Sequence, residues 1–368
     1  MQTTNKQVTG KNPRYLSLAD DMRKEIATLN VGQMLSPERE LAKQYSTSYT
    51  TIRRVLGVLE DEGLLLTYHG RGRVVLDPLL QGEFAIVVLS ELMRANHSLF
   101  YRETAMCLSE KIQRYPGVEW SSRLHLGGLA EKDKVFPATL DLLEPDVIKK
   151  LRGIFTFHSL EKQIKKELEQ KRIPVVQFGE DAHYADVSVA PQRDLFFRES
   201  LHYLRDIGCK TVGLLLGWNR REKHMSEPKN EHFFTKHAIE TGLSIQEKWI
   251  HRDFFGDSPE RYGYECFMKL WENGSKPEAF IIDDDIVACG VFRAILHKRI
   301  RVPEQIRLIT FANKGADLHY HRPVTRYEFD IREVVDTAFD AMVKLLSGQD
   351  LEYNVVCVPG KLIKGQTT

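Results

Sequence analysis

The stretch Leu35–Gly72 reads LSPERELAKQYSTSYTTIRRVLGVLEDEGLLLTYHGRG and decides the fold of the N-terminal part. Ser36-Pro37 predicts a helix start, with Ser as N-cap and Pro at the first helical position. After a break at Ser46–Ser48, a second helix places its apolar residues on one face, namely Ile52, Val55, Leu56 and Leu59. Two short strands, Leu64–Thr67 and Arg73–Leu76, then surround a glycine-rich tip. Together these elements predict a winged helix-turn-helix.

This layout is typical of DNA readout. A recognition helix enters the major groove with its N-terminal residues, and the corresponding side chains here are Ser48, Tyr49, Thr50, Thr51 and Arg53. The predicted wing tip carries basic residues between glycines, which favour phosphate contacts: His69, Arg71 and Arg73. The alternative is an ordinary helical hairpin with a solvated basic face. The agreement of turn, apolar register and basic tip favours the DNA-binding interpretation.

The same residues resemble the DNA-binding domain of the GntR family of bacterial regulators. The matching stretches are SPERELA (36–42), SYTTIRRVLGVLEDEGLL (48–65) and HGRG (69–72), and the resemblance covers about residues 14–76. The resemblance implies DNA contacts at Arg39, Ser48, Thr50, Thr51, Arg53, His69 and Gly70. We add Tyr49 and Arg71 to these candidate DNA contacts. Two features depart from the family. Leu35–Pro37 inverts its usual Pro-Ser order, and Tyr49 replaces a usual Arg, which removes a candidate guanine reader.

Length and composition limit the class of protein. The 368 residues suffice for a small and a large domain, and a net charge of +1 means that nucleic-acid binding must come from a local basic patch. The five cysteines form no CxxC pair and are interpreted as reduced thiols of the cytosol. The polar N-terminus shows no signal peptide, and no apolar run reaches the ~20 residues of a membrane span. We therefore expect a cytoplasmic protein without a membrane partner.

From Phe84 onward, apolar strands alternate with helices, which predicts an α/β fold with doubly wound parallel sheets. The predicted strands are Phe84–Leu89, Glu119–Leu126, Gly153–Phe157, Pro174–Phe178, Val212–Leu216, Ile245–His251, Ala279–Ile282 and Ile306–Phe311. The predicted helices are Leu99–Gln113, Leu142–Lys150, Leu160–Lys171, Asp194–Ile207 (capped by Asp194), Glu231–Thr241, Pro259–Glu272, Ile286–His297 and Glu333–Ser347.

This larger part resembles the LacI/GalR-type effector domain, which is related to periplasmic sugar-binding proteins. The resemblance rests on IPVVQFGE (173–180), ESLHYLRDIGCKTVGLLLG (199–217), PEAFIIDDDIVACGVFRAILHKRIRVPEQIRLITFAN (277–313), YEFDIREVVDTAFDAMVKLLSGQ (327–349) and VPGKLIKGQTT (358–368). It implies two α/β lobes joined by three crossover segments, a ligand between the lobes, and a homodimer. Joined to a GntR-type reader, it resembles sugar-use regulators of the arabinose-repressor type.

The expected organisation has four parts. Residues 1–13 form a flexible tail, 14–77 a winged helix-turn-helix DNA-binding domain, 78–83 a linker, and 84–368 the effector-binding and dimerisation domain. A short linker allows the second domain to influence the spacing of two DNA readers.

Three adjacent acids provide the best candidate for effector binding. Asp283, Asp284 and Asp285 follow a predicted strand and open a helix, where ligands of α/β sheets bind. Simple helix capping is the alternative interpretation. In the family's D-x-x-A-x-G motif the matching residues are Asp285, Ala288 and Gly290. The resemblance thereby implies that Asp285 accepts hydrogen bonds from ligand hydroxyls.

Four further residues are effector candidates. Trp218 follows a strand and can stack on a sugar ring, or pack on its own loop. Asn230 occupies a position where the family often has an Arg; because Asn cannot clamp an anion bidentately, it favours a neutral ligand. Asp181 and Phe100 lie near predicted strand ends.

No enzyme class fits the sequence, which lacks a phosphate-binding glycine loop, GxSxG and HExxH. The pairs His232/His237 and His319/His321 lack a third metal ligand, so no metal or cofactor is expected. The sequence predicts a repressor of carbohydrate-utilisation genes that binds double-stranded operator DNA and is released by a small neutral sugar. A nucleobase- or other metabolite-responsive regulator remains an alternative, as does, from a different class, a solute-binding protein.

Overall fold

The computed structural model describes residues 14–26, 28–29, 33–62, 64–68, 72–75, 81–94, 98–116, 119–127, 141–158, 160, 162–180, 185–217, 229–252, 258–272, 274–349 and 351–368. The chain forms two compact units. The first contains the chain up to Glu83 together with Gln113–Ser121 and Glu144–Arg152, and the second contains the remainder.

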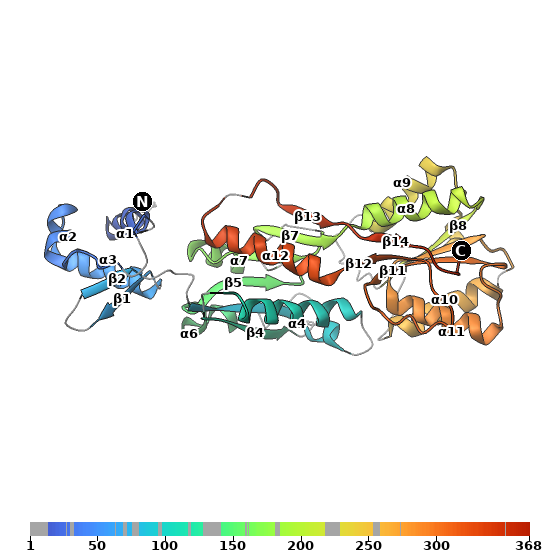
Figure 1. Ribbon diagram of the computed structural model, residues 1–368, viewed down its shortest axis with the longest axis horizontal. Coiled ribbons are helices and arrows are strands. Elements are labelled where there is room, and N and C mark those ends of the chain that lie inside the picture. The colour runs from blue at the N-terminus through green and yellow to red at the C-terminus, as the bar shows by residue number, and fades with distance from the viewer. Residues whose placement is uncertain are drawn as a thin grey trace, which may run out of the picture. The chain divides into compact units, whose positions relative to one another are not determined.

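The N-terminal elements form a winged helix-turn-helix, as predicted. They are α1 (Arg14–Ile26), α2 (Glu38–Gln44), α3 (Tyr49–Asp61), β1 (Leu65–Tyr68) and β2 (Gly72–Val75) (Figure 1). The strands β1 and β2 pair in antiparallel register. The predicted apolar face of α3 is buried, and it packs into one core with residues from every other element: Ala19, Met22, Ile26, Leu41, Leu65 and Val75. Burial of this face accounts for the position of the second helix.

Two details around α2 and β2 differ from the sequence prediction. The residue before α2 is Pro37, with no side-chain capping hydrogen bond, so Ser36 is not the predicted cap. The strand β2 also has a second neighbour, because Met34 bridges Val74 and the Leu35 amide donates to the Arg73 carbonyl at 2.8 Å. The segment before α2 therefore fixes the base of the wing.

The rest of the chain builds two six-stranded sheets. The first has the order β13 (Val355–Val358), β7 (Val187–Pro191), β6 (Val175–Phe178), β5 (Leu151–Thr156), β3 (Gln81–Leu89), β4 (Glu119–Gly127). The second has the order β14 (Lys361–Ile363), β12 (Arg326–Phe329), β11 (Arg307–Asn313), β10 (Ala279–Ile282), β8 (Val212–Leu215), β9 (Ile250–His251). The chain passes between the sheets after β7, β12 and β13, which agrees with the three crossover segments implied by the resemblance.

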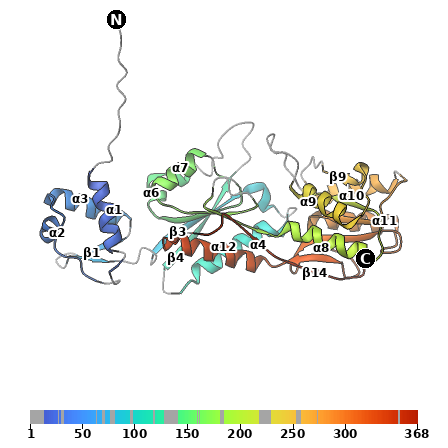
Figure 2. The ribbon, with the colours of Figure 1, turned by 90° about the horizontal axis from the view of Figure 1, so that it is seen from above.

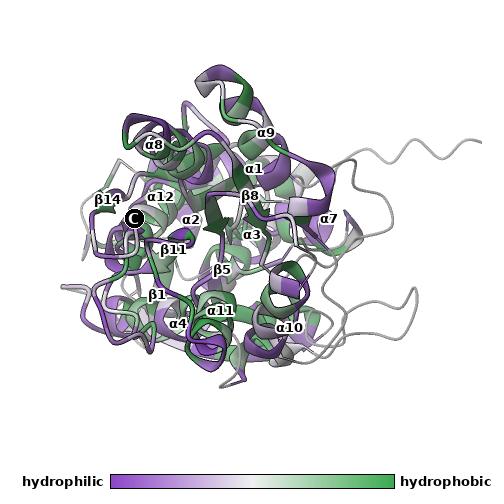
Figure 3. Ribbon diagram, turned by 90° about the vertical axis from the view of Figure 1, so that its right-hand side faces the viewer, coloured by the Kyte–Doolittle hydropathy of each residue, from purple (hydrophilic) through white to green (hydrophobic). Residues whose placement is uncertain are grey.

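Helices cover both faces of each sheet, so the α/β prediction is confirmed. Figure 2 shows α7 (Lys162–Gln170) on one side of the first sheet and α4 (Leu99–Gln113) and α12 (Ile331–Leu346) on the other. Figure 1 shows α8 and α9 on one side of the second sheet and α10 and α11 on the other; their bounds are Arg193–Asp206, Lys229–Thr241, Pro259–Glu272 and Asp285–Lys298. In Figure 3 the ribbons of α8 and α9 carry both hydrophobic (green) and hydrophilic (purple) segments, as expected for helices that pack on a sheet with one side and face solvent with the other.

Several predicted elements need correction. The strands β7, β12, β13 and β14 were not predicted. The predicted helix Leu142–Lys150 is the 3₁₀ turn Asp141–Leu143 followed by the short α6 (Pro145–Ile148). Only Ile250–His251 of the predicted strand Ile245–His251 is a strand, after the 3₁₀ turn Glu247–Trp249. A further 3₁₀ turn spans Ser90–Met93. Gln192, rather than Asp194, precedes α8.

Candidate functional site

The described part of the N-terminal unit contains six of the predicted DNA-contact residues. Five of them, Arg39, Ser48, Tyr49, Thr50 and Arg53, are exposed, whereas Thr51 is half-buried. Ser48 is the residue before α3, the first turns of α3 supply the others, and Arg39 lies on α2. The remaining three, His69, Gly70 and Arg71, lie outside the described residues. The structure therefore brings hydroxyl and guanidinium groups to the start of one helix.

Ser48 is the N-cap of α3. Its Oγ accepts a hydrogen bond from the Thr51 amide at 3.1 Å and lies 2.9 Å from the Thr50 hydroxyl and 2.7 Å from the Thr51 hydroxyl. A capping hydroxyl satisfies one of the amides that a helix leaves unpaired at its N-terminus. Ser48 thus has a structural role that is separate from the predicted DNA contact.

Tyr49 and Arg53 share one exposed face with the carboxylate of Glu38. The Arg53 guanidinium lies 5.4 Å from the centre of the Tyr49 ring, and its Nε is 3.7 Å from Glu38 Oε2. The Glu38 carboxylate, acting on the hydroxyl, raises the pKa of Tyr49. This neighbourhood orients Arg53 while leaving most of its side chain accessible, at 66% exposure.

Arg73, predicted as a phosphate contact of the wing tip, is instead held inside the domain. Its Nη1 lies 2.5 Å from Glu38 Oε1 and its Nε lies 2.7 Å from Glu60 Oε1. The Thr67 hydroxyl also donates to Glu60. Since only 18% of the Arg73 side chain is exposed, it joins α2, α3 and the wing rather than facing a groove.

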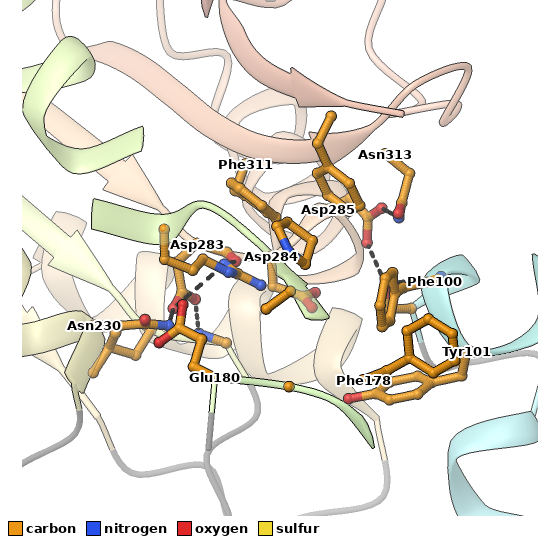
Figure 4. Close-up of a pocket in the computed structure, with 18 of the residues that line it drawn as sticks. Phe100, Tyr101, Phe178, Glu180, Asn230, Asp283, Asp284, Asp285, Phe311 and Asn313 are labelled. Carbon is orange, nitrogen blue, oxygen red and sulfur yellow. Dashed lines mark hydrogen bonds and ion pairs between the residues drawn. The ribbon is translucent and has the colours of Figure 1, made fainter. Parts of the chain in front are cut away.

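A cavity of about 400 Å³ lies in the second unit, where the carboxyl ends of strands from both sheets meet (Figure 4). Its charged or amide-bearing lining residues are Glu180, Arg193, Lys229, Asn230, Asp283, Asp284, Asp285 and Asn313. Its aromatic lining residues are Phe100, Tyr101, Phe157, Phe178, Phe311 and Phe329. Three of the sequence-predicted effector residues, Phe100, Asn230 and Asp285, therefore line one cavity.

The three adjacent acids have different partners. Asp283 accepts hydrogen bonds from the Gly217 amide and, at 2.9 Å, from Asn230 Nδ2. Asp284 is the N-cap of α11 and accepts from the Val287 amide at 2.9 Å. The capping role considered for Asp285 thus belongs to Asp284.

Asp285 begins α11 and is bound by side chains from two other segments. Its Oδ2 accepts from Asn313 Nδ2 at 2.5 Å, and its Oδ1 accepts from the Ser98 hydroxyl at 3.3 Å. Ser98 precedes α4, which packs on the first sheet, whereas Asp285 follows β10 of the second sheet. A ligand that binds Asp285 would compete with this contact between the two lobes.

Burial makes these carboxyl groups harder to ionise. It raises the pKa of Asp284 to about 7, and the neighbouring Asp285 carboxylate adds to that shift. Burial also raises the pKa of Asp283, although Arg193, the Gly217 amide and Asn230 act in the opposite direction. The pKa of Asp285 is likewise raised by burial against the hydrogen bonds of Asn313 and Ser98. Neutral hydrogen-bond donors therefore fit this wall of the cavity well.

Arg193 is the guanidinium of the cavity, and the sequence did not indicate it. Its Nη1 donates to the main-chain carbonyl of Asp283, and it lies 4.0 Å from Asp283 Oδ2. Its guanidinium carbon lies 3.7 Å from the centre of the Phe311 ring. Arg193 begins α8 directly after β7, so predicting β7 would have drawn attention to this strand end.

Ser98, Asn313 and several aromatic residues were also missed. Asn313 ends β11, a signal of the same kind, and Phe311 lies two positions earlier on that strand. Phe100 contacts Phe329 of the second sheet, with ring centres 6.0 Å apart. The predicted effector residues Trp218 and Asp181 lie outside the described residues.

Across the described residues, no three or more His, Cys, Asp or Glu side chains are grouped so as to hold a metal ion. His237, one of the histidines considered for metal binding, instead lies with its ring nitrogens 2.8 Å from Asp194 and from Glu240. In the same part of the chain, no helix combines the length and the apolarity needed to cross a membrane.

Comparison with known families agrees with this arrangement. Residues 14–75 match the family described as bacterial regulatory proteins, gntR family, and residues 201–368 match the periplasmic binding protein-like domain. An HTH-type transcriptional repressor PurR from Pasteurella multocida is 36% identical over 123 residues, which span 33% of this chain and 35% of that repressor. The chain thus covers about a third of that curated relative.

Solved structures share the fold. A lac repressor dimer bound to operator and the anti-inducer ONPF has a TM-score of 0.61 at 18% identity, covering 78% of this chain and 94% of that chain. A LacI family regulator CCPA from Weissella paramesenteroides with bound glucose has a TM-score of 0.60 at 17% identity, covering 77% of this chain and 97% of that chain. At these identities the likeness concerns the fold alone.

Proposed function

We propose that this chain, which joins a GntR-type helix-turn-helix domain to a LacI-type periplasmic-binding-protein-like domain, is a ligand-responsive transcriptional repressor. Residues 14–77 bind operator DNA, residues 78–83 link the domains, and residues 84–368 bind the effector and form a homodimer. A small neutral sugar in the cavity releases the DNA. The observation that carries the proposal is the cavity at the strand ends, with acidic acceptors on one wall and aromatic rings on another.

DNA binding is assigned to the N-terminal part of α3. Ser48, Tyr49, Thr50, Thr51 and Arg53, together with Arg39 of α2, present hydroxyl and guanidinium groups, which suit phosphates and base edges. His69, Gly70 and Arg71 are assigned to the wing contact by the family resemblance. A solute-binding protein, the alternative from a different class, does not need a winged helix-turn-helix domain to capture its ligand.

The charge of the cavity favours a neutral effector. Its lining includes the carboxyl groups of Glu180 and Asp283–Asp285, against the two cations Arg193 and Lys229. An excess of acids repels an anionic ligand, whereas the hydroxyl groups of a sugar can donate to Asp285 and accept from Asn230. Phe100, and Trp218 by the sequence argument, are assigned to the apolar face of the sugar ring, and Asp181 to its hydroxyls. A volume of about 400 Å³ suits a mono- or disaccharide.

A purine is the second candidate effector. The aromatic lining could stack on a base, and the PurR repressor is among the relatives of this chain. A binding panel that contains pentoses, hexoses, disaccharides, hypoxanthine and guanine distinguishes the two effectors. The regulatory mechanism is the same for both.

A homodimer would place two readers on a pseudo-palindromic operator. Within the second unit, Met106 of α4 is 62% exposed, and Leu124 and Leu126 of β4 are 43% and 52% exposed. The hydrogen bond between Ser109 and Ser122 brings α4 next to β4, so these three apolar side chains belong to one region of the surface. This region supports dimerisation through the effector domain, in a cytoplasmic protein that acts on DNA.

Two variants separate the proposed activities. Duplexes are first selected by the full-length native chain from a randomised pool, and effectors are identified with the panel. Arg53→Ala should abolish binding to the selected duplex and leave effector binding intact. Asp285→Ala should leave DNA binding intact and remove the response to effector.

Each variant has its own contradicting result. Unchanged duplex affinity in Arg53→Ala would show that α3 is not the recognition helix. A full effector response in Asp285→Ala would remove Asp285 from the effector site. Failure of the native chain to select any duplex would overturn the proposed function as a whole.

A further inference from the structure

Arg193 lines the cavity, and the proposed function gives it no role in binding the effector. We propose that Arg193 reads the effector: it donates to the oxygen of a ligand hydroxyl whose own proton is donated to Asp284 or Asp285. This inference rests on the proposed sugar effector and deepens it, because it identifies the residue that distinguishes a hydroxylated ring from its deoxy analogues.

The guanidinium is held before any ligand arrives. It lies against the Phe311 ring, with 3.7 Å between the guanidinium carbon and the ring centre. Its Nη1 donates to the Asp283 carbonyl, and Asp283 is itself fixed by the Gly217 amide and Asn230. With its side chain only 25% exposed, Arg193 loses little conformational entropy when it binds a ligand.

Most of the donors of Arg193 are unused by the described residues. A guanidinium has five N–H groups, and the one hydrogen bond seen among the described residues uses a single Nη1 donor. The carboxyl groups of Asp284 and Asp285 line the same cavity, and the charge of Arg193 lowers the pKa of Asp284 against the effect of burial. The N–H donors of Arg193 and the carboxyl groups of Asp284 and Asp285, two residues that Figure 4 labels, therefore line one cavity.

A hydroxyl group matches this pair because it accepts and donates at once. An ether oxygen can accept from Arg193 but has no proton to donate, and a deoxy carbon does neither, so each loses hydrogen bonds in a buried site, which is costly. A carboxylate or phosphate gains little, since the charge of Arg193 is already balanced by Asp283 at 4.0 Å. The structure thus favours a neutral polyol over its uronate or phosphate derivative.

The test compares Arg193→Met, which keeps an aliphatic stem on Phe311, with Arg193→Lys, which keeps the charge. Arg198→Met, an exposed arginine on the same helix, is the matched control. Calorimetric titration uses the full-length chain and whichever of D-glucose, D-galactose, D-xylose and L-arabinose binds the native protein, together with the monodeoxy forms of that sugar.

Loss of charged hydrogen bonds should weaken sugar binding about 10–100-fold in Arg193→Met, less in Arg193→Lys, and not at all in Arg198→Met. One monodeoxy sugar should bind the native chain weakly and lose little further affinity in Arg193→Met, because both changes remove the same contact. A merely structural role would weaken every sugar equally. DNA binding should be retained in all three variants.

The outcomes are distinguishable. Sugar binding by Arg193→Met within twofold of the native chain would overturn the role of Arg193 and leave the sugar effector standing. An equal loss for the parent sugar and all its deoxy forms would also overturn it. Binding of glucuronate or glucose 6-phosphate in preference to D-glucose would contradict the inference that Asp283 already balances the charge of Arg193. If no sugar binds the native chain, the sugar effector and the role of Arg193 both fail.

Discussion

Replacing Arg73 with Met removes the guanidinium that joins α2, α3 and the wing, while it keeps an unbranched side chain. The change leaves Glu38 and Glu60, whose side chains are 15% and 29% exposed, without their partner at 2.5 and 2.7 Å. Glu38 then keeps Arg53, at 3.7 Å, and the hydroxyl of Tyr49. The native pairs are neither fully buried nor solvent-exposed, so the cost lies between the limits known for those two classes.

Breaking a buried ion pair costs about 3–5 kcal/mol, and an exposed pair contributes about 0–1 kcal/mol. For this partly buried pair of contacts we expect a loss of about 2–3 kcal/mol in the free energy of unfolding of the N-terminal domain. In a domain of this size, about 1 kcal/mol shifts the melting temperature by about 4–8 °C. The melting temperature should therefore fall by roughly 10–20 °C.

Differential scanning calorimetry of the full-length chain measures this shift. All four tryptophans lie outside residues 14–77, at positions 120, 218, 249 and 271. Tryptophan fluorescence therefore follows the rest of the chain and should report an unchanged transition. Arg39→Met, at an exposed arginine of α2, is the matched control and should leave both transitions in place.

A second variant separates the ion pairs from the packing of the arginine stem. Glu38→Gln combined with Arg73→Met should recover part of the lost stability, because no unpaired carboxylate remains at position 38. An N-terminal transition within 3 °C of the native one in Arg73→Met would refute the assignment of Arg73 as the residue that joins the three elements.

Three further changes test other parts of the structure. Ser48→Ala should lower the stability of the N-terminal domain by about 1 kcal/mol through loss of the α3 cap; a urea titration followed by circular dichroism measures it, and an unchanged midpoint would contradict the cap. Gly290→Ala should destabilise the effector domain by more than about 3 kcal/mol, since its Cβ would lie 1.8 Å from the Glu260 carbonyl oxygen of α10; a native tryptophan-monitored melt would contradict that close packing. The pKa of Asp284, about 7, lies above its unfolded value of about 4. The folded state therefore holds more protons between these values, and stability should fall as the pH rises from about 4 to 7. Asp284→Asn keeps a capping oxygen and should lose this part of the fall in stability with pH. Identical profiles of melting temperature against pH for the native chain and Asp284→Asn would rule out the raised pKa.

The elements with strong periodicity were predictable. The bounds of α10 and β10 agree with the prediction, and the buried face of α3 follows from apolar residues spaced three and four apart. The strands β7 and β13 were missed although both contain valines, because each is only four or five residues long. They pair in parallel with each other, and this pairing joins segments that are distant in sequence and that no local pattern connects.

The cavity was predictable only in part. The rule that ligands bind at strand ends pointed to Asp285, Phe100 and Asn230, but the roles of Asp283 and Asp284 depend on contacts that no local pattern encodes. Arg193 followed a strand that was not predicted. Arg73 was misassigned because a basic residue next to glycines suggests a phosphate contact, whereas two carboxylates from other elements hold it.

The most direct measurement is the affinity of the full-length native chain for its selected duplex, with and without a saturating sugar from the panel. A coupling of about 1–3 kcal/mol predicts that the sugar weakens DNA binding about 5–150-fold. The same titration on Asp285→Ala should show no effect of the sugar. An affinity for the duplex that is unchanged or increased when the native chain is saturated with sugar would contradict release of the operator by the effector.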